Sequence, residues 1–250
     1  IHLEEEKDSQ SEIKHHVTNP KNKVSAFVSI MQGCNMNCSF CIVPKTRGRE
    51  RYRSIDDIVA EVEKLSNNGI KEVTLLGQIV NAYGRGKFEK VDGKTPFVQL
   101  LDKIHCLAGI ERIRFTSPHP ISFGKDLIKA FGRLEKLGSY AHLPMQSGSN
   151  KILKSMNRPY TREKFIKLVE QLRKTNKNMR ISTDVIVGYP GEDSEDFELT
   201  KDAFIKCGFE MAFIFKYSER SGTPAAVLDD KVPQEVKESR NKELLNLLER

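Results

Sequence analysis

From residue 24 onward, short runs of apolar residues alternate with longer stretches in which apolar residues recur at helical spacing. This alternation is typical of parallel βα units, and it predicts six of them. Because a closed barrel of this type needs eight units, the sequence predicts an α/β fold: a partial (βα)6 TIM-like barrel with parallel strands, open on one side. The predicted strands cover residues 24–31, 72–76, 112–115, 139–143, 180–187 and 210–216.

Local signals predict where the helices begin. Ser54 precedes an acidic first turn, and Pro96 occupies a first-turn position. Thr161 and Ser194 each precede a stretch with apolar residues on one face, and a last helix is expected after Pro233.

The connections between these elements fall into two groups. Those from helix to strand are short, whereas those from strand to helix are long and rich in polar residues and glycine. Right-handed crossovers bring every connection of the second group to the carboxyl end of the sheet, which is the functional end of such folds. These long connections are residues 33–53, 77–86, 116–120, 144–150, 188–193 and 217–224.

The chain has 250 residues, of which 38% are hydrophobic, so it is long enough to bury a substantial core. No stretch approaches the roughly 18 consecutive apolar residues of a membrane helix, and the acidic start lacks the features of a secretory signal. We therefore expect a cytoplasmic protein with no membrane partner. The formal net charge of +7 favours an anionic partner such as a nucleic acid.

Three of the five cysteines, Cys34, Cys38 and Cys41, stand directly after the first predicted strand. Disulfides explain this clustering and the odd cysteine count poorly. Three thiolates at this spacing suit one corner of a cubane iron–sulfur cluster and leave one iron for a non-protein ligand. The alternative is a structural zinc ion, which requires a fourth ligand such as His15, His16 or Cys106. Cys106 and Cys207 follow apolar helical stripes, so we expect both to be buried.

The Cys-x3-Cys-x2-Cys motif, with Phe40 before its last cysteine, resembles that of the radical S-adenosylmethionine (SAM) superfamily. Residues 32–50 resemble the methylthiotransferases of that superfamily. Residues 75–78, 114–117, 142–149 and 184–192 are similar to the MiaB branch, which acts on tRNA. The resemblance covers residues 24–233. It implies an enzyme, a radical SAM tRNA methylthiotransferase that adds a methylthio group to the 2-position of N6-isopentenyladenosine next to the anticodon.

The resemblance also implies two cofactors and their contacts. A [4Fe-4S] cluster on Cys34, Cys38 and Cys41, the metal and catalytic ligands, binds S-adenosyl-L-methionine at its open iron. An electron from a reducing donor then splits the SAM to give a 5′-deoxyadenosyl radical. The implied SAM-binding residues are Phe40 beside the adenine, Gln78 and Asn81 at the amino acid end, and Gln146, Ser147, Asp184 and Gly188 at the ribose and adenine. Three of these residues have an alternative role: Asn81 and Ser147 could form turns, and Asp184 could satisfy backbone groups in the core.

Basic residues alternate along the segment after the cysteines. We expect them to contact phosphates of a tRNA anticodon stem-loop, which would give salt-dependent affinity. The alternatives are a solvated charged edge, or arginines that brace the cysteine loop. Tyr83, His119 and Tyr217 are candidates for stacking on a splayed-out base, or for packing. The basic residues are Lys45, Arg47, Arg49, Arg51 and Arg53.

The expected domain organisation follows from the same resemblance. Residues 1–23 are polar and are expected to be a lead-in or linker from an upstream domain, residues 24–232 the radical SAM core, and residues 233–250 a helix leading to a downstream domain. The family's upstream domain carries a second, auxiliary [4Fe-4S] cluster, and its downstream domain binds RNA. Since neither is in this sequence, we expect a monomeric core that cleaves SAM alone but does not insert sulfur.

Three other functions stay open at this point. Two belong to sister branches, which modify threonylcarbamoyladenosine in tRNA or an aspartate of a ribosomal protein. The third is a non-catalytic, metal-stabilised RNA-binding module. The sequence departs from the family pattern at two positions. Ile79 follows Gly77-Gln78, where the family usually has Asn, and Ser221 follows Tyr217-Ser218-x-Arg220, where the family usually has Pro-Gly.

Overall fold

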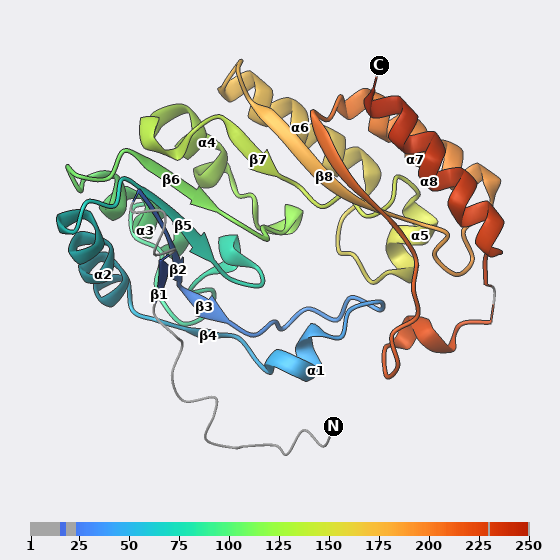
Figure 1. Cartoon of the computed structure of the whole chain (residues 1–250), viewed down its shortest axis with the longest axis horizontal. Helices are drawn as coiled ribbons and strands as arrows, with labels where there is room; N and C mark the ends of the chain where they lie inside the picture. Colours follow the sequence, from blue (N-terminus) through green and yellow to red (C-terminus); the bar gives the residue numbers. More distant parts are fainter. Residues whose placement is uncertain (1–15, 19–23, 230, 250) are drawn as a thin grey trace.

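The computed structural model describes residues 16–18, 24–229 and 231–249, and Figure 1 shows an arc of strands with helices on its outer side. One sheet contains β1 (His16–Thr18), β2 (Ser25–Ser29), β5 (Glu72–Leu76) and β6 (Arg112–Phe115), in that order. A second sheet contains β7 (Tyr140–His142), β8 (Arg180–Val187) and β9 (Met211–Lys216). β1 runs antiparallel to β2, and all other neighbours in these two sheets are parallel.

The six parallel strands confirm the predicted partial TIM-like barrel, which is open on the side opposite the helices (Figure 1). β5, β6 and β8 have the predicted bounds, whereas β7 and β9 are slightly shorter than predicted. The expectation for residues 1–23 falls mostly outside the described residues; within it, residues 16–18 form β1.

The first predicted strand is interrupted at Ile30. The Ile30 amide still donates to the Leu76 carbonyl, at 3.0 Å, but its carbonyl accepts from the Arg53 amide, at 3.1 Å. The chain thus leaves the barrel sheet and forms an antiparallel pair of β3 (Met31–Gln32) and β4 (Arg51–Tyr52). This pair closes residues 33–50 into a long loop that contains the short helix α1 (Val43–Arg47).

The predicted helix starts are confirmed, with one adjustment. The Ser54 hydroxyl accepts from the Asp57 amide at 3.1 Å, and Thr161 caps its helix in the same way. Asp193, rather than Ser194, is the N-cap of its helix and forms a capping box with Asp196. The helices are α2 (Ile55–Asn67), α3 (Pro96–His105), α4 (Lys125–Arg133), α5 (Asn150–Ser155), α6 (Arg162–Thr175), α7 (Ser194–Cys207) and α8 (Gln234–Leu248); short 3-10 turns cover Val80–Ala82, Pro120–Ser122, Glu135–Leu137 and Pro224–Val227.

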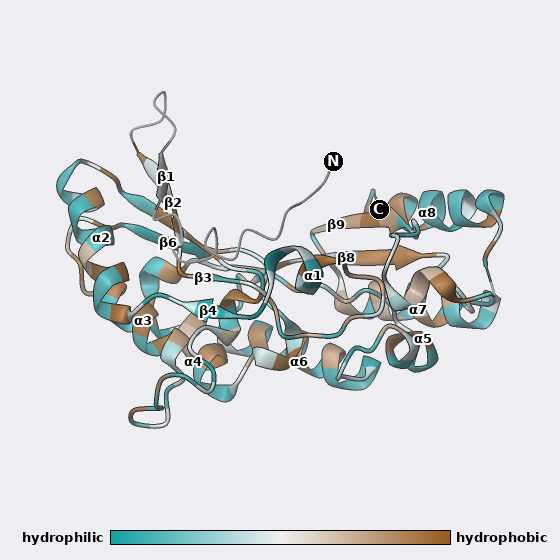
Figure 2. Cartoon of the chain, turned by 90° about the horizontal axis from the view of Figure 1, so that it is seen from below, coloured by the Kyte–Doolittle hydropathy of each residue, from teal (hydrophilic) through white to brown (hydrophobic). Residues whose placement is uncertain are grey.

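The main core lies between the arc of strands and the surrounding helices. Val28, Leu75 and Ile113 extend from the strands, and Leu101 and Leu172 face them from the helices, all of them buried. In Figure 2 the hydrophobic stretches of the helices and β8 coincide with this layer. Burial of such side chains stabilises the fold by about 1.5–3 kcal/mol each. No helix of the described residues is long and apolar enough to cross a membrane.

Candidate functional site

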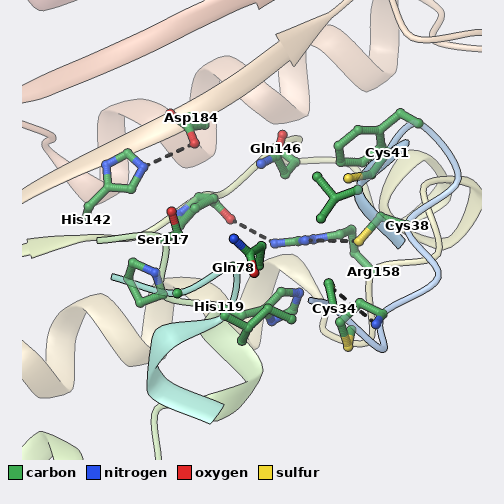
Figure 3. Close-up of a pocket in the computed structure, with 17 residues that line it drawn as sticks. Cys34, Cys38, Cys41, Gln78, Ser117, His119, His142, Gln146, Arg158 and Asp184 are labelled. Atoms are coloured by element: carbon green, nitrogen blue, oxygen red, sulfur yellow. Dashed lines mark hydrogen bonds and ion pairs between the residues drawn. The ribbon is translucent and has the colours of Figure 1, made fainter. Parts of the chain in front are cut away.

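A cavity of about 320 Å³ opens at the carboxyl ends of the parallel strands (Figure 3). An adjoining cavity of the same volume shares Phe40, Cys41, Gln146 and Asp184 with it and extends to Tyr217. The first cavity is lined by the loop of residues 33–50, here called the cysteine loop, by residues after β5 and β6, by the end of β7 and by Arg158 after α5. The lining residues include Cys34, Cys38, Gln78, Ser117, His119, His142 and Arg158.

The cysteine loop is held against the barrel by backbone hydrogen bonds. Gly33 has a φ of +86°, and a Cβ at this position would meet the carbonyl group of Arg49, so only glycine fits. The Gly33 amide donates to Gln78 Oε1 at 2.5 Å. The Ser39 amide donates to the Met156 carbonyl at 3.1 Å. The loop is therefore fixed from two sides of the cavity.

The three thiols of the motif line the first cavity and are free and partly exposed. Cys34 Sγ accepts from the Met36 amide, and Cys38 Sγ accepts from Arg158 Nη1, both at 3.4 Å. Burial, followed by the charges of Cys38 and Glu50, raises the pKa of Cys34 to about 11 despite the Met36 amide. Among the described residues, no three His, Cys, Asp or Glu side chains converge as they would around one metal ion.

The two remaining cysteines lie outside the loop, at the C-terminal ends of α7 and α3. Cys207 is buried, as predicted, at the end of α7. Cys106 is exposed at the C-cap of α3, so the prediction that it is buried is wrong. The apolar stripe of α3 ends at Ile104, and Cys106 lies on the outward side of the cap.

Polar side chains linked by hydrogen bonds lie along the wall formed by β7 and β8. His142 Nε2 lies 3.1 Å from Asp184 Oδ2, and His142 Nδ1 lies 2.8 Å from the Ser182 hydroxyl. The Tyr140 hydroxyl lies 2.5 Å from that same Ser182 oxygen. The Asp184 side chain faces the cavity and not the core, so it is available to a ligand (Figure 3).

Two buried polar atoms in this cavity have no hydrogen-bond partner among the described residues. They are Gln146 Oε1 and His119 Nε2. The Gln146 backbone, at a φ of +66°, is bonded to the neighbouring strand, because its amide donates to the Asp184 carbonyl at 2.8 Å. Burial, followed by the charges of Arg158 and Arg85, lowers the pKa of His119 to about 3. Unpartnered buried atoms that share a cavity indicate a place for a polar ligand.

Three predicted contacts are not part of this cavity. Both ends of the buried Asn81 amide bind the backbone of His119, at 3.0 and 2.8 Å, so Asn81 links two loops. Ser147 is buried, and its hydroxyl accepts from the Ser149 amide at 3.1 Å. The Gly188 amide donates to the buried Glu192 carboxylate at 2.8 Å. The structure thus gives Asn81, Ser147 and Gly188 structural positions, and among the described residues none of them lines either cavity.

The basic residues after the cysteines divide into two groups. Lys45, Arg47 and Arg49 are exposed, and the Lys45 ammonium donates to the Gly222 carbonyl. Arg51 is half-buried and donates to Gln32 Oε1 at 2.8 Å. Arg53 is buried and pairs with two carboxylates of α2, so the expectation that it contacts RNA is wrong. The alternation of basic residues in the sequence does not show that one of them, Arg53, is buried.

The candidate stacking residues are also packed. Tyr83 is buried, and its hydroxyl donates to the Arg53 carbonyl at 2.5 Å. The His119 ring packs edge-on against Tyr160, and Tyr217 packs edge-on against Tyr189. Of the three, Tyr217 lines the adjoining cavity and His119 the first.

Arg158 is a cavity residue that sequence reasoning missed. It follows the six-residue helix α5 and stands 120 residues after Cys38, to which it donates. Neither its spacing nor its neighbours in the sequence indicate this contact.

Comparison with known proteins agrees with this geometry. The radical SAM superfamily matches residues 28–204. The chain is 60% identical to a tRNA-2-methylthio-N(6)-dimethylallyladenosine synthase of Opitutus terrae, over 92% of this chain and 48% of that protein. It is 55% identical to a protein of the same name from Akkermansia muciniphila, over 96% of this chain and 52% of that protein. The chain spans about half the length of these curated relatives.

Solved structures share the fold at low sequence identity. The radical SAM methyltransferase TsrM from Kitasatospora setae, with cobalamin and a [4Fe-4S] cluster bound, has a TM-score of 0.65 at 18% identity, over 80% of this chain and 38% of that one. Coproporphyrinogen III oxidase (HemN) from Escherichia coli has a TM-score of 0.61 at 15% identity, over 90% and 52%. With a superfamily match over most of its length and the same barrel, this chain belongs to the radical SAM superfamily.

Proposed function

We propose that this chain is the radical SAM core of a tRNA methylthiotransferase, which adds a methylthio group to the 2-position of N6-isopentenyladenosine next to the anticodon. The cysteine loop at the mouth of the barrel cavity is the observation that carries the proposal. The names of the relatives at 55–60% identity support the substrate and favour it over threonylcarbamoyladenosine or a ribosomal protein aspartate.

The residues of the cavity fit a [4Fe-4S] cluster and SAM. Cys34, Cys38 and Cys41 supply three sulfur ligands, and a cluster with three protein ligands keeps one iron for SAM. The unpartnered atoms of Gln146 and His119 offer hydrogen bonds to a polar ligand beside them. When bound, the cluster supplies the electron that cleaves SAM to a 5′-deoxyadenosyl radical.

The protein's own residues hold and orient these groups. Gln78 fixes the start of the cysteine loop through the Gly33 amide. Phe40 lies at the junction of the two cavities, where its ring can cover the adenine and exclude water. Gln146 and Asp184 face the same junction, and His142 orients the Asp184 carboxylate for a ribose hydroxyl.

RNA binding is proposed for the exposed basic residues near this opening. Lys45, Arg47 and Arg49 extend from α1 and the segment after it, on the same loop as the three cysteines that line the cavity. Arg51 lies between them and the barrel, where its hydrogen bond to Gln32 braces β3 against β4. Contacts of this kind with phosphates give binding that weakens as salt increases.

The proposal includes the organisation of the chain. Residues 24–232 would form the core, and residues 233–250 its C-terminal helix. The five free thiols suit a reducing compartment, so we propose a cytoplasmic protein that receives its electron from a soluble reductant. We also propose that the chain is a monomer, which sedimentation of the reconstituted chain would test.

Anaerobic reconstitution with iron and sulfide tests the proposal. The chain should then release 5′-deoxyadenosine from SAM under a strong reductant. Cys34→Ala, Cys38→Ala and Cys41→Ala should abolish the release, whereas the matched control Cys106→Ala should retain it, because Cys106 lies at the far end of α3. Release that is unchanged in the motif variants would refute the proposal.

A further inference from the structure

Three arginines are buried in the part of the chain that the structure describes: Arg53, Arg158 and Arg240, at 7%, 8% and 7% exposure. Two of them have carboxylate partners. Arg53 lies 2.8 Å from Asp57 and 2.6 Å from Glu61. Taking a charge out of water costs several kcal/mol, so a buried arginine normally has an anion beside it.

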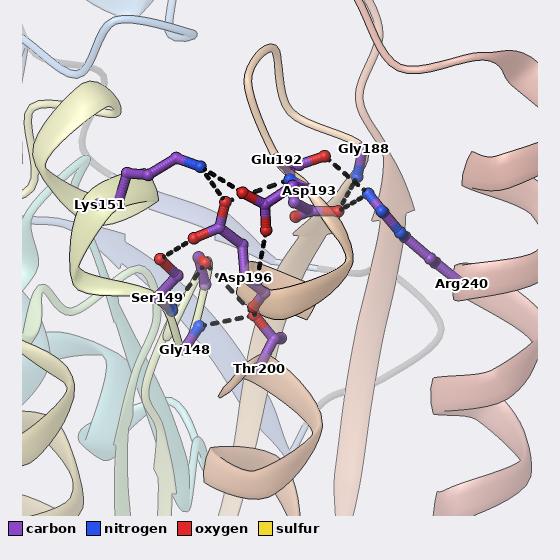
Figure 4. Close-up of polar contacts among 10 residues, drawn as sticks. Gly148, Ser149, Lys151, Gly188, Glu192, Asp193, Asp196, Thr200 and Arg240 are labelled. Atoms are coloured by element: carbon purple, nitrogen blue, oxygen red, sulfur yellow. Dashed lines mark hydrogen bonds and ion pairs between the residues drawn. The ribbon is translucent and has the colours of Figure 1, made fainter. Parts of the chain in front are cut away.

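Arg240 is the clearest case of such pairing (Figure 4). Its Nη1 lies 2.6 Å from the carboxylate of Glu192, which is itself 1% exposed, and also donates to the Glu192 carbonyl at 3.1 Å. The guanidinium also lies over the Phe197 ring. Arg240 on α8 and Glu192 before α7 therefore neutralise each other inside the protein.

Arg158 has no carboxylate within ion-pair distance among the described residues. Its Nε donates to the Tyr160 hydroxyl at 3.1 Å, and its Nη2 to the Pro144 carbonyl at 3.5 Å. Its Nη1 donates to Cys38 Sγ at 3.4 Å. Figure 3 shows this guanidinium extending between the cysteine loop and the opposite wall of the cavity. Of these neighbours, the sulfur is the one that carries negative charge when it is a metal ligand.

The neutral acceptors do not require Arg158. The Tyr160 hydroxyl also contacts the Pro144 and Met145 carbonyls, each at 3.0 Å, so those carbonyls keep a donor if the arginine is removed. A purely structural role would thus be served as well by an apolar side chain of similar size. A permanently charged group in this position points to an anion in the cavity.

We propose that Arg158 is a positioning residue for the iron–sulfur cluster: it acts through Cys38 as the cluster's built-in counter-ion and stabilises the more negative, reduced state. This inference rests on the proposed function. Net charge and hydrogen bonds to the cysteine sulfurs are among the factors that set the reduction potential of such a cluster. Arg158 would therefore make the cluster easier to reduce before SAM is cleaved.

A redox titration of the reconstituted chain without SAM tests the proposal. Electron paramagnetic resonance measures the fraction of reduced cluster at each potential. Arg158→Met should shift the midpoint potential to more negative values, and Arg158→Lys, which keeps the charge, should restore most of the difference. Equal potentials in the parent and Arg158→Met would overturn the proposal. If SAM affinity alone fell in that variant, the arginine would serve the carboxylate of SAM instead.

The cluster-free chain gives a second and independent readout. Without the cluster, Arg158→Met should leave the melting temperature unchanged or raised, because it removes a buried charge that has no carboxylate partner. The matched control Arg240→Met should lower it, because Glu192 is left buried without its cation. After reconstitution, the parent should gain more thermal stability than Arg158→Met.

Two outcomes separate this inference from the proposed function. If the parent chain binds no iron, the proposed function fails. If the parent binds a cluster but cluster-free Arg158→Met melts as far below the parent as Arg240→Met does, Arg158 has a structural role and this inference alone fails.

Discussion

The buried His119 side chain makes the stability of the chain depend on pH in a calculable way. It is 4% exposed, and burial, together with the charges of Arg158 and Arg85, lowers its pKa from 6.5 to about 3. Because the pKa is lower in the folded state, the contribution to stability is complete above pH 6.5. It is lost as the pH falls towards 3, since the unfolded chain then binds a proton that the folded chain excludes.

The size of this effect follows from the two pKa values. Proton binding by His119 favours the unfolded state by about 0.2 kcal/mol at pH 7 and by about 2 kcal/mol at pH 5. A folded pKa one unit higher changes the value at pH 5 by only about 0.05 kcal/mol. The prediction therefore depends on the direction of the pKa shift and hardly on its exact size.

Urea denaturation of the parent and of His119→Asn, at pH 7 and pH 5, measures the effect. In the parent, the Ile121 amide donates a hydrogen bond to His119 Nδ1 at 3.2 Å. The side-chain oxygen of asparagine can accept the same hydrogen bond. From pH 7 to pH 5, the free energy of unfolding of the parent should fall by about 2 kcal/mol more than that of the variant. Volume loss in the variant cancels in this comparison. Equal decreases in the two proteins would refute a buried neutral His119.

Three further predictions concern the loop, its basic residues and a helix cap. Gly33→Ala should lower the iron bound per chain after reconstitution, because its Cβ would displace the backbone of Arg49; iron content equal to the parent would contradict this. Arg47→Ala and Arg49→Ala should each weaken binding to an anticodon stem-loop and reduce the slope of log affinity against log salt by about 1, and unchanged slopes would exclude phosphate contacts. Ser54→Ala should lower the free energy of unfolding by about 1 kcal/mol, since α2 loses its N-terminal acceptor; an unchanged urea midpoint would count against the cap.

The barrel strands were predictable because apolar residues mark the positions that are buried. β5 and β8 are runs rich in branched residues, and β6 alternates arginine with the apolar Ile113 and Phe115. The bounds of all three agree with the prediction. Helix α4 was missed because it begins after Gly124 without a side-chain cap and contains Gly132, so both local signals are weak. α1 and α5 are too short for a periodic pattern to be recognised.

The site was predictable only where spacing along the chain determines position in space. The three cysteines stand on one loop, so their closeness follows from the sequence. Asn81, Ser147 and Gly188 also follow strands, but other groups of the protein engage them. The partner of Asn81 is His119, 38 positions further on, whose location depends on packing. Ser147 and Gly188 are engaged by near neighbours in the sequence, Ser149 and Glu192.

Arg158 and Arg53 show the same limit for charged residues. Arg53 belongs to an alternating basic run and is turned inward by two carboxylates of α2. Arg158 reaches Cys38 across 120 positions of sequence. A charge pattern predicts an exposed surface on average, and it does not identify the members that tertiary contacts bury.

The composition of the metal centre decides whether the cavity is a radical SAM site. If the cavity is such a site, the anaerobically reconstituted chain will hold about four irons and four sulfides, with one iron whose Mössbauer signal changes when SAM is added. A single colourless, tetrahedrally coordinated ion bound by the same three cysteines, with no response to SAM, would contradict it.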